Sequence, residues 1–152
     1  SKKKGRGGFT PLFMACQEGH LKVVQVLLTR KEIQINQADQ DGETPLYIAC
    51  QQGHWDIVKE LLKTSGIQAN QAMHNGTTPL IIATYMGNSS IVKLLLSIDD
   101  IDVSATFEEK TAVYYAKANG RVANWSSLDD QINEDGRIEC QILFQNFNKY
   151  IA

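Results

Sequence analysis

The sequence predicts an all-α repeat solenoid, in which helix-turn-helix units stack on one another and β-hairpin fingers join them. Two observations lead to this fold class. The tripeptide Thr-Pro-Leu begins at Thr10, Thr44 and Thr78, and a degraded copy begins at Thr111, so that the spacings are 34, 34 and 33 residues. A glycine stands nine residues after each of these threonines, and an apolar stretch with helical spacing follows the first three glycines. A fixed period of this length indicates a repeat architecture.

Each unit is expected to begin with a short helix. Threonine is a good N-cap residue, and proline fits the first helical position, where its missing N–H leaves no bond unmade. Apolar residues such as Leu46 and Ile48 then face the neighbouring units. The glycine supplies the left-handed conformation that ends the helix and reverses the chain.

The second helix of each unit carries paired apolar residues, as in Ile57-Val58 and Leu61-Leu62. This stripe is too wide for an isolated helix, so neighbouring units must stack to bury it. The linkers 37–43 and 71–77 contain an Asp-Gly and an Asn-Gly pair, which favour tight hairpin turns. We therefore expect two antiparallel helices and one finger in each unit.

The repeat divides the chain into three parts. Residues 1–8 are a flexible basic arm with a partial first finger, residues 9–132 are four repeats (about 9–36, 37–70, 71–104 and 105–132), and residues 133–152 are a C-terminal capping helix. The fourth repeat lacks the finger glycine and has an eroded second helix, as terminal units do, so we expect it to fray first. We also expect the chain to be an excerpt from a longer protein, because it starts inside a finger.

The composition is that of an ordinary folded domain. The 152 residues are 43% hydrophobic and 21% charged, with a net charge of −2, which excludes disordered and collagen-like classes. No apolar run approaches the roughly 20 residues of a membrane span, and the N-terminus has no secretory signal. The three cysteines give no disulfide framework and indicate a reducing compartment. We expect an intracellular protein of the cytoplasm, with the nucleus as the alternative.

The second unit contains the pattern Asp39-x-x-Gly42-x-Thr44-Pro45-Leu46, followed by Gly53-His54. This pattern closely resembles the signature of the ankyrin repeat family, and the resemblance covers about residues 5–121. It implies helix pairs joined by hairpin fingers that project roughly perpendicular to the helices. It also implies a general role in binding other proteins.

Two departures from the family carry structural expectations. The family has a histidine after Thr-Pro-Leu that ties neighbouring units by hydrogen bonds, whereas this chain has Phe13, Tyr47, Ile81 and Tyr114. We therefore expect packing to replace that network. The connection after the second helix is one residue longer than usual. There, the resemblance implies that Asn36 and Asn70 have the spacing at which asparaginyl hydroxylases modify ankyrin repeats, although we expect both to serve structurally at the finger base.

The sequence contains no catalytic constellation. His20 and His54 follow repeat glycines, which favours structural roles, and Cys16 and Cys50 take equivalent small-residue positions in the core. No histidine or cysteine pair has the spacing of a zinc site. Adjacent carboxylates such as Asp99-Asp100 point apart and do not form an acid–base dyad. We expect no enzyme activity, no cofactor and no metal; the alternative is a substrate-recruiting or regulatory segment of a larger enzyme.

The family resemblance places the partner-binding positions at the fingertips and on the solvent side of each first helix. In this sequence they are Phe9, Gln17, Glu18, Gln40, Asp41, Glu43, Gln51, Gln52, Met73, His74, Thr77, Tyr85, Met86, Phe107, Glu108, Ala118 and Asn119. The third unit differs from the others, because Met73, Tyr85 and Met86 stand where polar residues are usual, and Tyr and Met are enriched at interfaces. We expect these three residues and His74 to anchor a partner, unless Tyr85 and Met86 simply pack against the fourth finger.

We expect a monomeric chain that binds a protein partner, which the sequence does not identify. A basic head and an acidic tail are also indicated, since residues 1–31 carry seven basic side chains and one acid, whereas residues 99–139 carry ten acids and four bases. Lys2–Arg6 could bind nucleic acid or another anion, but they lack interleaved aromatic residues, so we do not expect this. A purely structural spacer is a further alternative.

Overall fold

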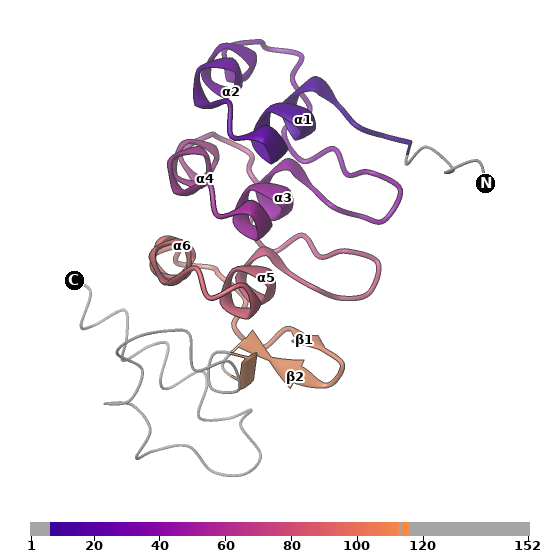
Figure 1. Ribbon diagram of the computed structural model, residues 1–152, viewed down its shortest axis with the longest axis vertical. Coiled ribbons are helices and arrows are strands. Elements are labelled where there is room, and N and C mark those ends of the chain that lie inside the picture. Colours follow the sequence, from indigo (N-terminus) through magenta and orange to yellow (C-terminus); the bar gives the residue numbers. More distant parts are fainter. Residues whose placement is uncertain (1–6, 113, 116–152) are drawn as a thin grey trace.

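The computed structural model describes residues 7–112, 114 and 115. Helices and strands in these residues are α1 (Pro11–Glu18), α2 (Leu21–Leu28), α3 (Pro45–Gln52), α4 (Trp55–Leu62), α5 (Pro79–Tyr85), α6 (Ser89–Leu96), β1 (Thr106–Phe107) and β2 (Lys110–Thr111). Figure 1 shows the three helix pairs stacked one below another, with the β1–β2 hairpin beneath them. The helix pairs predicted for the first three units are confirmed. The basic arm, the second helix of the fourth unit and the capping helix fall outside the described residues.

The first helices begin as the sequence predicts. The hydroxyl oxygens of Thr10, Thr44 and Thr78 accept hydrogen bonds from the backbone N–H three residues later, at 3.1, 3.1 and 3.2 Å. Proline follows each threonine at the start of the helix. α1 and α3 end at Gly19 and Gly53, both in the left-handed conformation. Short-range chemistry therefore fixes where these helices start and where α1 and α3 stop.

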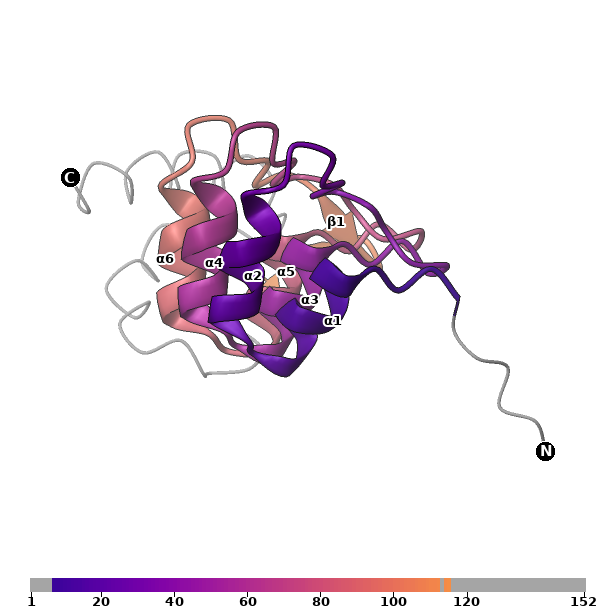
Figure 2. The ribbon, with the colours of Figure 1, turned by 90° about the horizontal axis from the view of Figure 1, so that it is seen from above.

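The molecule has three layers, which Figure 2 shows from above: the outer helices α2, α4 and α6, the inner helices α1, α3 and α5, and the fingers. Inner helices pack on inner helices of the adjacent unit, and outer helices pack on outer helices. The core is therefore deepest in the middle of the stack. Ile48 in α3 is 3% exposed, whereas Met14, its equivalent in α1, is 40% exposed.

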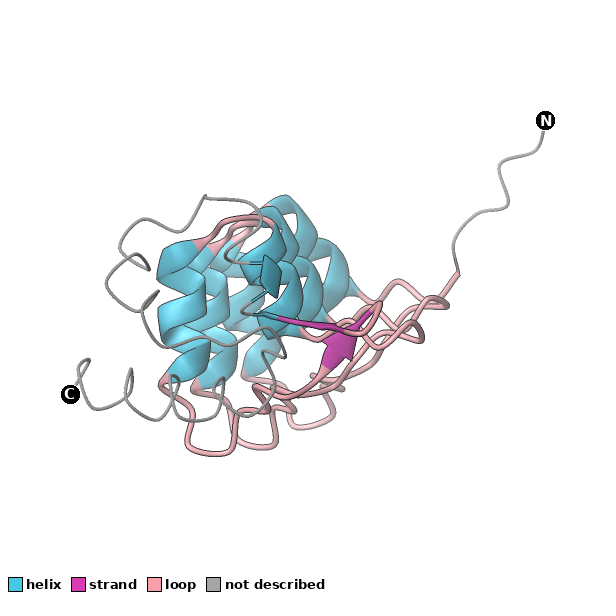
Figure 3. Cartoon of the chain, turned by 90° about the horizontal axis from the view of Figure 1, so that it is seen from below, coloured by secondary structure: helices cyan, strands magenta, loops and turns pink. Residues whose placement is uncertain are grey.

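The fingers are tight turns, as predicted, but most are not strand pairs. In the second finger the N–H of Asp39 donates to the carbonyl oxygen of Glu43 at 3.0 Å, and in the third finger Met73 donates to Thr77 at 2.9 Å. Figure 3 shows that, within the described part of the chain, regular strands occur only in the fourth finger. There β1 and β2 are antiparallel, with Phe107 opposite Lys110.

We expected four side chains to join the units by packing in place of the family's histidine network. The structure confirms this for three of them and not for the fourth. Phe13, Tyr47 and Ile81 are buried in the core. Tyr114, which we expected to pack in the same way, is about half exposed, and the Lys110 ammonium lies 4.6 Å from the centre of its ring.

Side-chain hydrogen bonds also join neighbouring units. The amide of Asn36 donates to the carbonyl oxygen of Gly66 at 2.8 Å, and its oxygen accepts from the N–H of Gln68 at 2.9 Å. Asn70 makes the equivalent pair of bonds to Asp100 and Asp102, both at 2.8 Å. The two asparagines, each directly before a finger, therefore tie the loop of one unit to the loop of the next unit, and the structural role expected for them is confirmed.

Candidate protein-binding surface

Most of the predicted binding residues within the described part of the chain are accessible. Nine are exposed: Phe9, Glu18, Gln40, Asp41, Gln52, His74, Tyr85, Met86 and Glu108. Four are partly buried: Gln17, Gln51, Met73 and Phe107. Ala118 and Asn119 lie outside the described residues. The fingers and the ends of the inner helices thus present one accessible side of the molecule, which we call the finger side.

Two predicted binding residues are buried, and their assignment to the surface was wrong. Glu43 is 8% exposed and Thr77 is 5% exposed. Each stands one residue before an N-cap threonine, where the finger returns to the helices. The N–H of Glu43 donates to the side chain of Asp39 at 2.8 Å, and the N–H of Thr77 donates to the side chain of Asn75 at 3.0 Å. Both residues therefore belong to the framework of the fingers.

The second and third fingers are packed backbone against backbone. The N–H of His74 donates to the carbonyl oxygen of Asp41 at 3.1 Å. A Cβ atom added to Gly42 would lie 2.9 Å from the His74 nitrogen, which is too close, and the φ of Gly42 is +87°. Glycine is therefore required at this position both for its backbone conformation and for the close approach. This contact fixes where Met73 and His74 stand.

An aromatic cluster joins the third unit to the fourth. The Tyr85 ring, at the end of α5, meets the Tyr115 ring edge to face, with the ring centroids 5.6 Å apart. The Tyr115 hydroxyl donates to the carbonyl oxygen of Phe107 at 2.9 Å, and burial raises the pKa of Tyr115. Tyr85 nevertheless remains 50% exposed and Met86 41% exposed. Packing on the fourth unit therefore accounts for only part of the Tyr85 surface.

The structure separates the predicted anchor into two groups. Met73 and His74 contact the second finger, whereas Tyr85 contacts Tyr115. Sequence reasoning did not name Tyr115 as part of the surface. Its register gives the missing signal, because Tyr115 stands four residues after Thr111, as Ile82 stands four after Thr78. The equivalent residues of the second and third units, Ile48 and Ile82, are buried in the core.

Charge is segregated across the stack. Residues 7–19, 37–53, 71–87 and 105–115, which form the inner helices and fingers, contain six acidic residues and one lysine. The outer helices and their loops, residues 20–36, 54–70 and 88–104, contain six acidic and six basic residues. Two of the six acids, Asp39 and Glu43, are buried, and the other four are exposed. The finger side is therefore acidic and the outer side is balanced. This asymmetry is distinct from the head-to-tail one that the sequence indicates.

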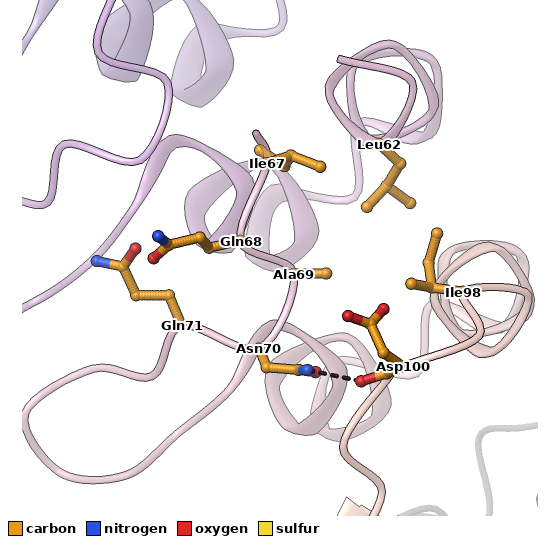
Figure 4. Close-up of a pocket in the computed structure, with 8 residues that line it drawn as sticks. All are labelled: Leu62, Ile67, Gln68, Ala69, Asn70, Gln71, Ile98 and Asp100. Carbon is orange, nitrogen blue, oxygen red and sulfur yellow. Dashed lines mark hydrogen bonds between the residues drawn. The ribbon is translucent and has the colours of Figure 1, made fainter. Parts of the chain in front are cut away.

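A pocket of about 530 Å³ lies between the loops that follow α4 and α6. Figure 4 shows the apolar side chains of Leu62, Ala69 and Ile98 around it, with the bond from Asn70 to Asp100 at one edge. Asp100 is the one titratable residue of its lining, and no second acid–base group, hydroxyl, thiol or cation stands with it there. The pocket lies where successive units meet, and it has no chemistry of a catalytic site.

The remaining reactive groups do not form a site within the described residues. Cys16 and Cys50 are fully buried, and burial raises the pKa of Cys16 to about 12 and raises the pKa of Cys50 as well. Both thiols are therefore neutral and inert in the folded chain. The described part of the chain holds no group of three or more residues that could ligate a metal ion. None of its helices has the length and apolar character needed to cross a bilayer.

Comparison with known families identifies the architecture. The family model described as ankyrin repeats in three copies matches the overlapping segments 1–73, 27–107 and 63–128. The chain therefore belongs to the ankyrin repeat family, and the predicted all-α repeat solenoid is confirmed. Ankyrin repeats are generally protein–protein interaction modules and are typically non-catalytic. Comparison with the curated proteins finds no match to this chain.

Proposed function

We propose that this chain is a non-enzymatic module that binds a partner protein through its finger side, with Tyr85 and Met86 as the central contact. The observation that carries this proposal is the exposure of two large side chains at the end of an inner helix, 50% for Tyr85 and 41% for Met86. Side chains of these types are enriched in the anchors of protein interfaces.

The other units support this assignment by contrast. Gln17-Glu18 in the first unit and Gln51-Gln52 in the second unit occupy the positions equivalent to Tyr85-Met86. A polar pair is therefore compatible with the fold at these positions, and the stability of the repeat does not require an aromatic residue there. The exposed apolar pair of the third unit is better explained by contact with another molecule.

The charge of the finger side favours a protein over a nucleic acid. Phosphate backbones bind to surfaces that carry several lysine and arginine residues. The finger side of the described chain exposes four acids, and its one lysine is half-buried, so this surface repels a polyanion.

The test is a comparison of binding by the full chain and by Tyr85→Gln/Met86→Gln. Glutamine is the residue that the second unit carries at both positions, so the variant should fold, and circular dichroism checks this. The matched control is Val23→Gln/Val26→Gln, which replaces two exposed apolar side chains of α2 on the outer side of the stack. A protein captured by wild type and control but lost from Tyr85→Gln/Met86→Gln supports the proposal. Equal capture by all three contradicts it.

A further inference from the structure

We propose that the finger side binds a basic peptide segment of its partner, in which a bulky apolar residue is flanked by lysine or arginine. The inference rests on the proposed function and adds the chemistry of the partner. It follows from the apolar patch at Tyr85 and Met86 together with the charge around it.

The apolar patch has acidic residues beside it. Tyr85 contacts Tyr115, whose ring stacks on Phe107 with the centroids 6.3 Å apart. Phe107 is followed directly by Glu108 and Glu109, which form the exposed two-residue turn between β1 and β2. The Tyr85–Tyr115–Phe107 series therefore leads from the apolar patch to two neighbouring carboxylates at the tip of the fourth finger.

Other exposed carboxylates lie on the finger side of the first and second units. Asp41 is exposed on the second finger, and its carbonyl oxygen binds the N–H of His74 on the third finger. Glu18 is exposed at the end of α1. The one lysine on the finger side, Lys110, is half-buried and lies over the Tyr114 ring. A peptide that binds to this surface therefore contacts the apolar patch and faces mainly negative charge.

These charges select among the possible occupants. Acidic peptides and nucleic acids would be repelled. A second copy that docked its described outer surface would offer six acids and six bases, and so no net positive charge. A basic segment with an apolar residue fits both the apolar patch and the negative charge. Its apolar side chain is buried against Tyr85 and Met86, and its lysine or arginine side chains face the carboxylates.

The test uses selection from a random-peptide phage library on the full chain, followed by fluorescence anisotropy with the strongest selected peptide. The key variant is Glu108→Asn/Glu109→Gly. It removes two charges, and Asn-Gly suits the positive φ values of 49° and 62° at these positions, so the hairpin is kept. The matched control is Asp99→Asn/Asp100→Asn, which removes the same charge from the outer side.

We expect selected peptides rich in lysine and arginine around an apolar residue. Their affinity should fall about 30-fold in Tyr85→Gln/Met86→Gln and about tenfold in Glu108→Asn/Glu109→Gly. It should not change in the control, and it should weaken with added salt.

The outcomes separate this inference from the function on which it rests. Peptides that need Tyr85 and Met86 but are neutral or acidic, or that bind Glu108→Asn/Glu109→Gly as well as wild type, would overturn the basic-peptide inference and leave the proposed function in place. Selection that yields no peptide dependent on Tyr85 and Met86 would overturn both. Sedimentation tests whether the chain self-associates through its own Lys2–Arg6. Self-association that increases with concentration would overturn the inference of a separate partner, because a second copy of the chain would then supply the basic segment.

Discussion

The Nε2 atom of His54 lies 3.0 Å from the carbonyl oxygen of Gln17 in the preceding unit. The imidazole ring rests on Gly19, where an added Cβ atom would come within 2.7 Å of it. One unit later, the amide of Asn88 donates to the carbonyl oxygen of Cys50 at 3.0 Å. The residues that follow Gly53 and Gly87 thus bond to the C-terminal part of the previous inner helix, which confirms the structural role predicted for His54.

Loss of this bond should weaken the stack. In His54→Ala the carbonyl oxygen of Gln17 loses its partner, and we expect the free energy of unfolding to fall by about 1–2 kcal/mol. His54→Asn should recover most of this loss, because Asn88 at the equivalent position bonds to the preceding inner helix through the carbonyl oxygen of Cys50, one residue before the equivalent of Gln17. Urea denaturation measures both effects.

His20→Ala is the control, because His20 occupies the equivalent position in the first unit and is exposed. It should change the stability by less than about 0.5 kcal/mol. If His20→Ala and His54→Ala have the same effect, the bond to Gln17 does not contribute to the cohesion of the stack.

The asparagine links between the loops give a second prediction. Asn70→Ala removes two hydrogen bonds of 2.8 Å to the loop of the next unit, and we expect it to lower the free energy of unfolding by about 1 kcal/mol, because the site is exposed. The N–H of Asp102 donates a hydrogen bond to the side chain of Asn70. In the variant, this N–H should therefore show faster hydrogen exchange. Ser65→Ala, an exposed change in the same loop, serves as the control. Unchanged exchange at Asp102 would mean that water replaces the side chain without loss.

Glu109 occupies a glycine position. Gly42 and Gly76 stand two residues before their threonines with φ values of 87° and 89°, whereas Glu109 stands there before Thr111 with a φ of 62°. A side chain in this conformation stores strain. We expect Glu109→Gly to raise the free energy of unfolding by about 0.5–1 kcal/mol, after the greater flexibility of glycine in the unfolded chain is subtracted. Thermal denaturation measures it.

Glu109→Gln is the control for that gain, since it removes the charge of Glu109 but keeps a side chain at positive φ. Stabilisation by glycine alone would locate the effect in the backbone. Equal stabilisation by both changes would assign it to repulsion between Glu108 and Glu109.

Stability should decrease at alkaline pH. Exposed thiols ionise near pH 9, whereas burial raises the pKa of Cys16 to about 12 and the pKa of Cys50 still further. Burial also raises the pKa of Tyr47 from 10 to about 12. Because the unfolded chain releases these protons first, the stabilisation is complete below pH 9 and is lost as the pH rises toward 12.

The urea midpoint at pH 8 and pH 10.5 measures this loss. Cys16→Ala/Cys50→Ala should reduce the difference between the two midpoints, even if it lowers both. An unchanged difference would assign the alkaline effect to tyrosine, and no difference in wild type would contradict the prediction.

Those features of the fold that depend on short-range chemistry could be predicted from the sequence. The cap of Thr44 joins residues three apart, and the left-handed glycine at Gly53 acts on its own helix, so both are visible in a local pattern. The burial of Glu43 was missed, because an acidic residue in a polar linker is typical of a surface. Its burial follows from its place beside the N-cap, where the finger returns to the helices.

The sequence was sufficient to name most residues of the candidate surface, but not to predict how they are arranged in space. Tyr85 and Met86 stand out because polar residues occupy their positions in the other units. The contact of Tyr85 with Tyr115 spans 30 residues, and only the fold brings them together. The acidic character of the finger side is also invisible in the linear charge pattern, since inner and outer segments alternate along the chain.

The principal helix contacts join each unit to its neighbour in the sequence. Closing such a contact encloses only a short loop, so the entropy lost on forming it is small. A unit also has its partner available as soon as the next unit has been synthesised. The stack can therefore assemble in order while the chain leaves the ribosome. Each folded helix pair then provides the surface on which the next pair packs.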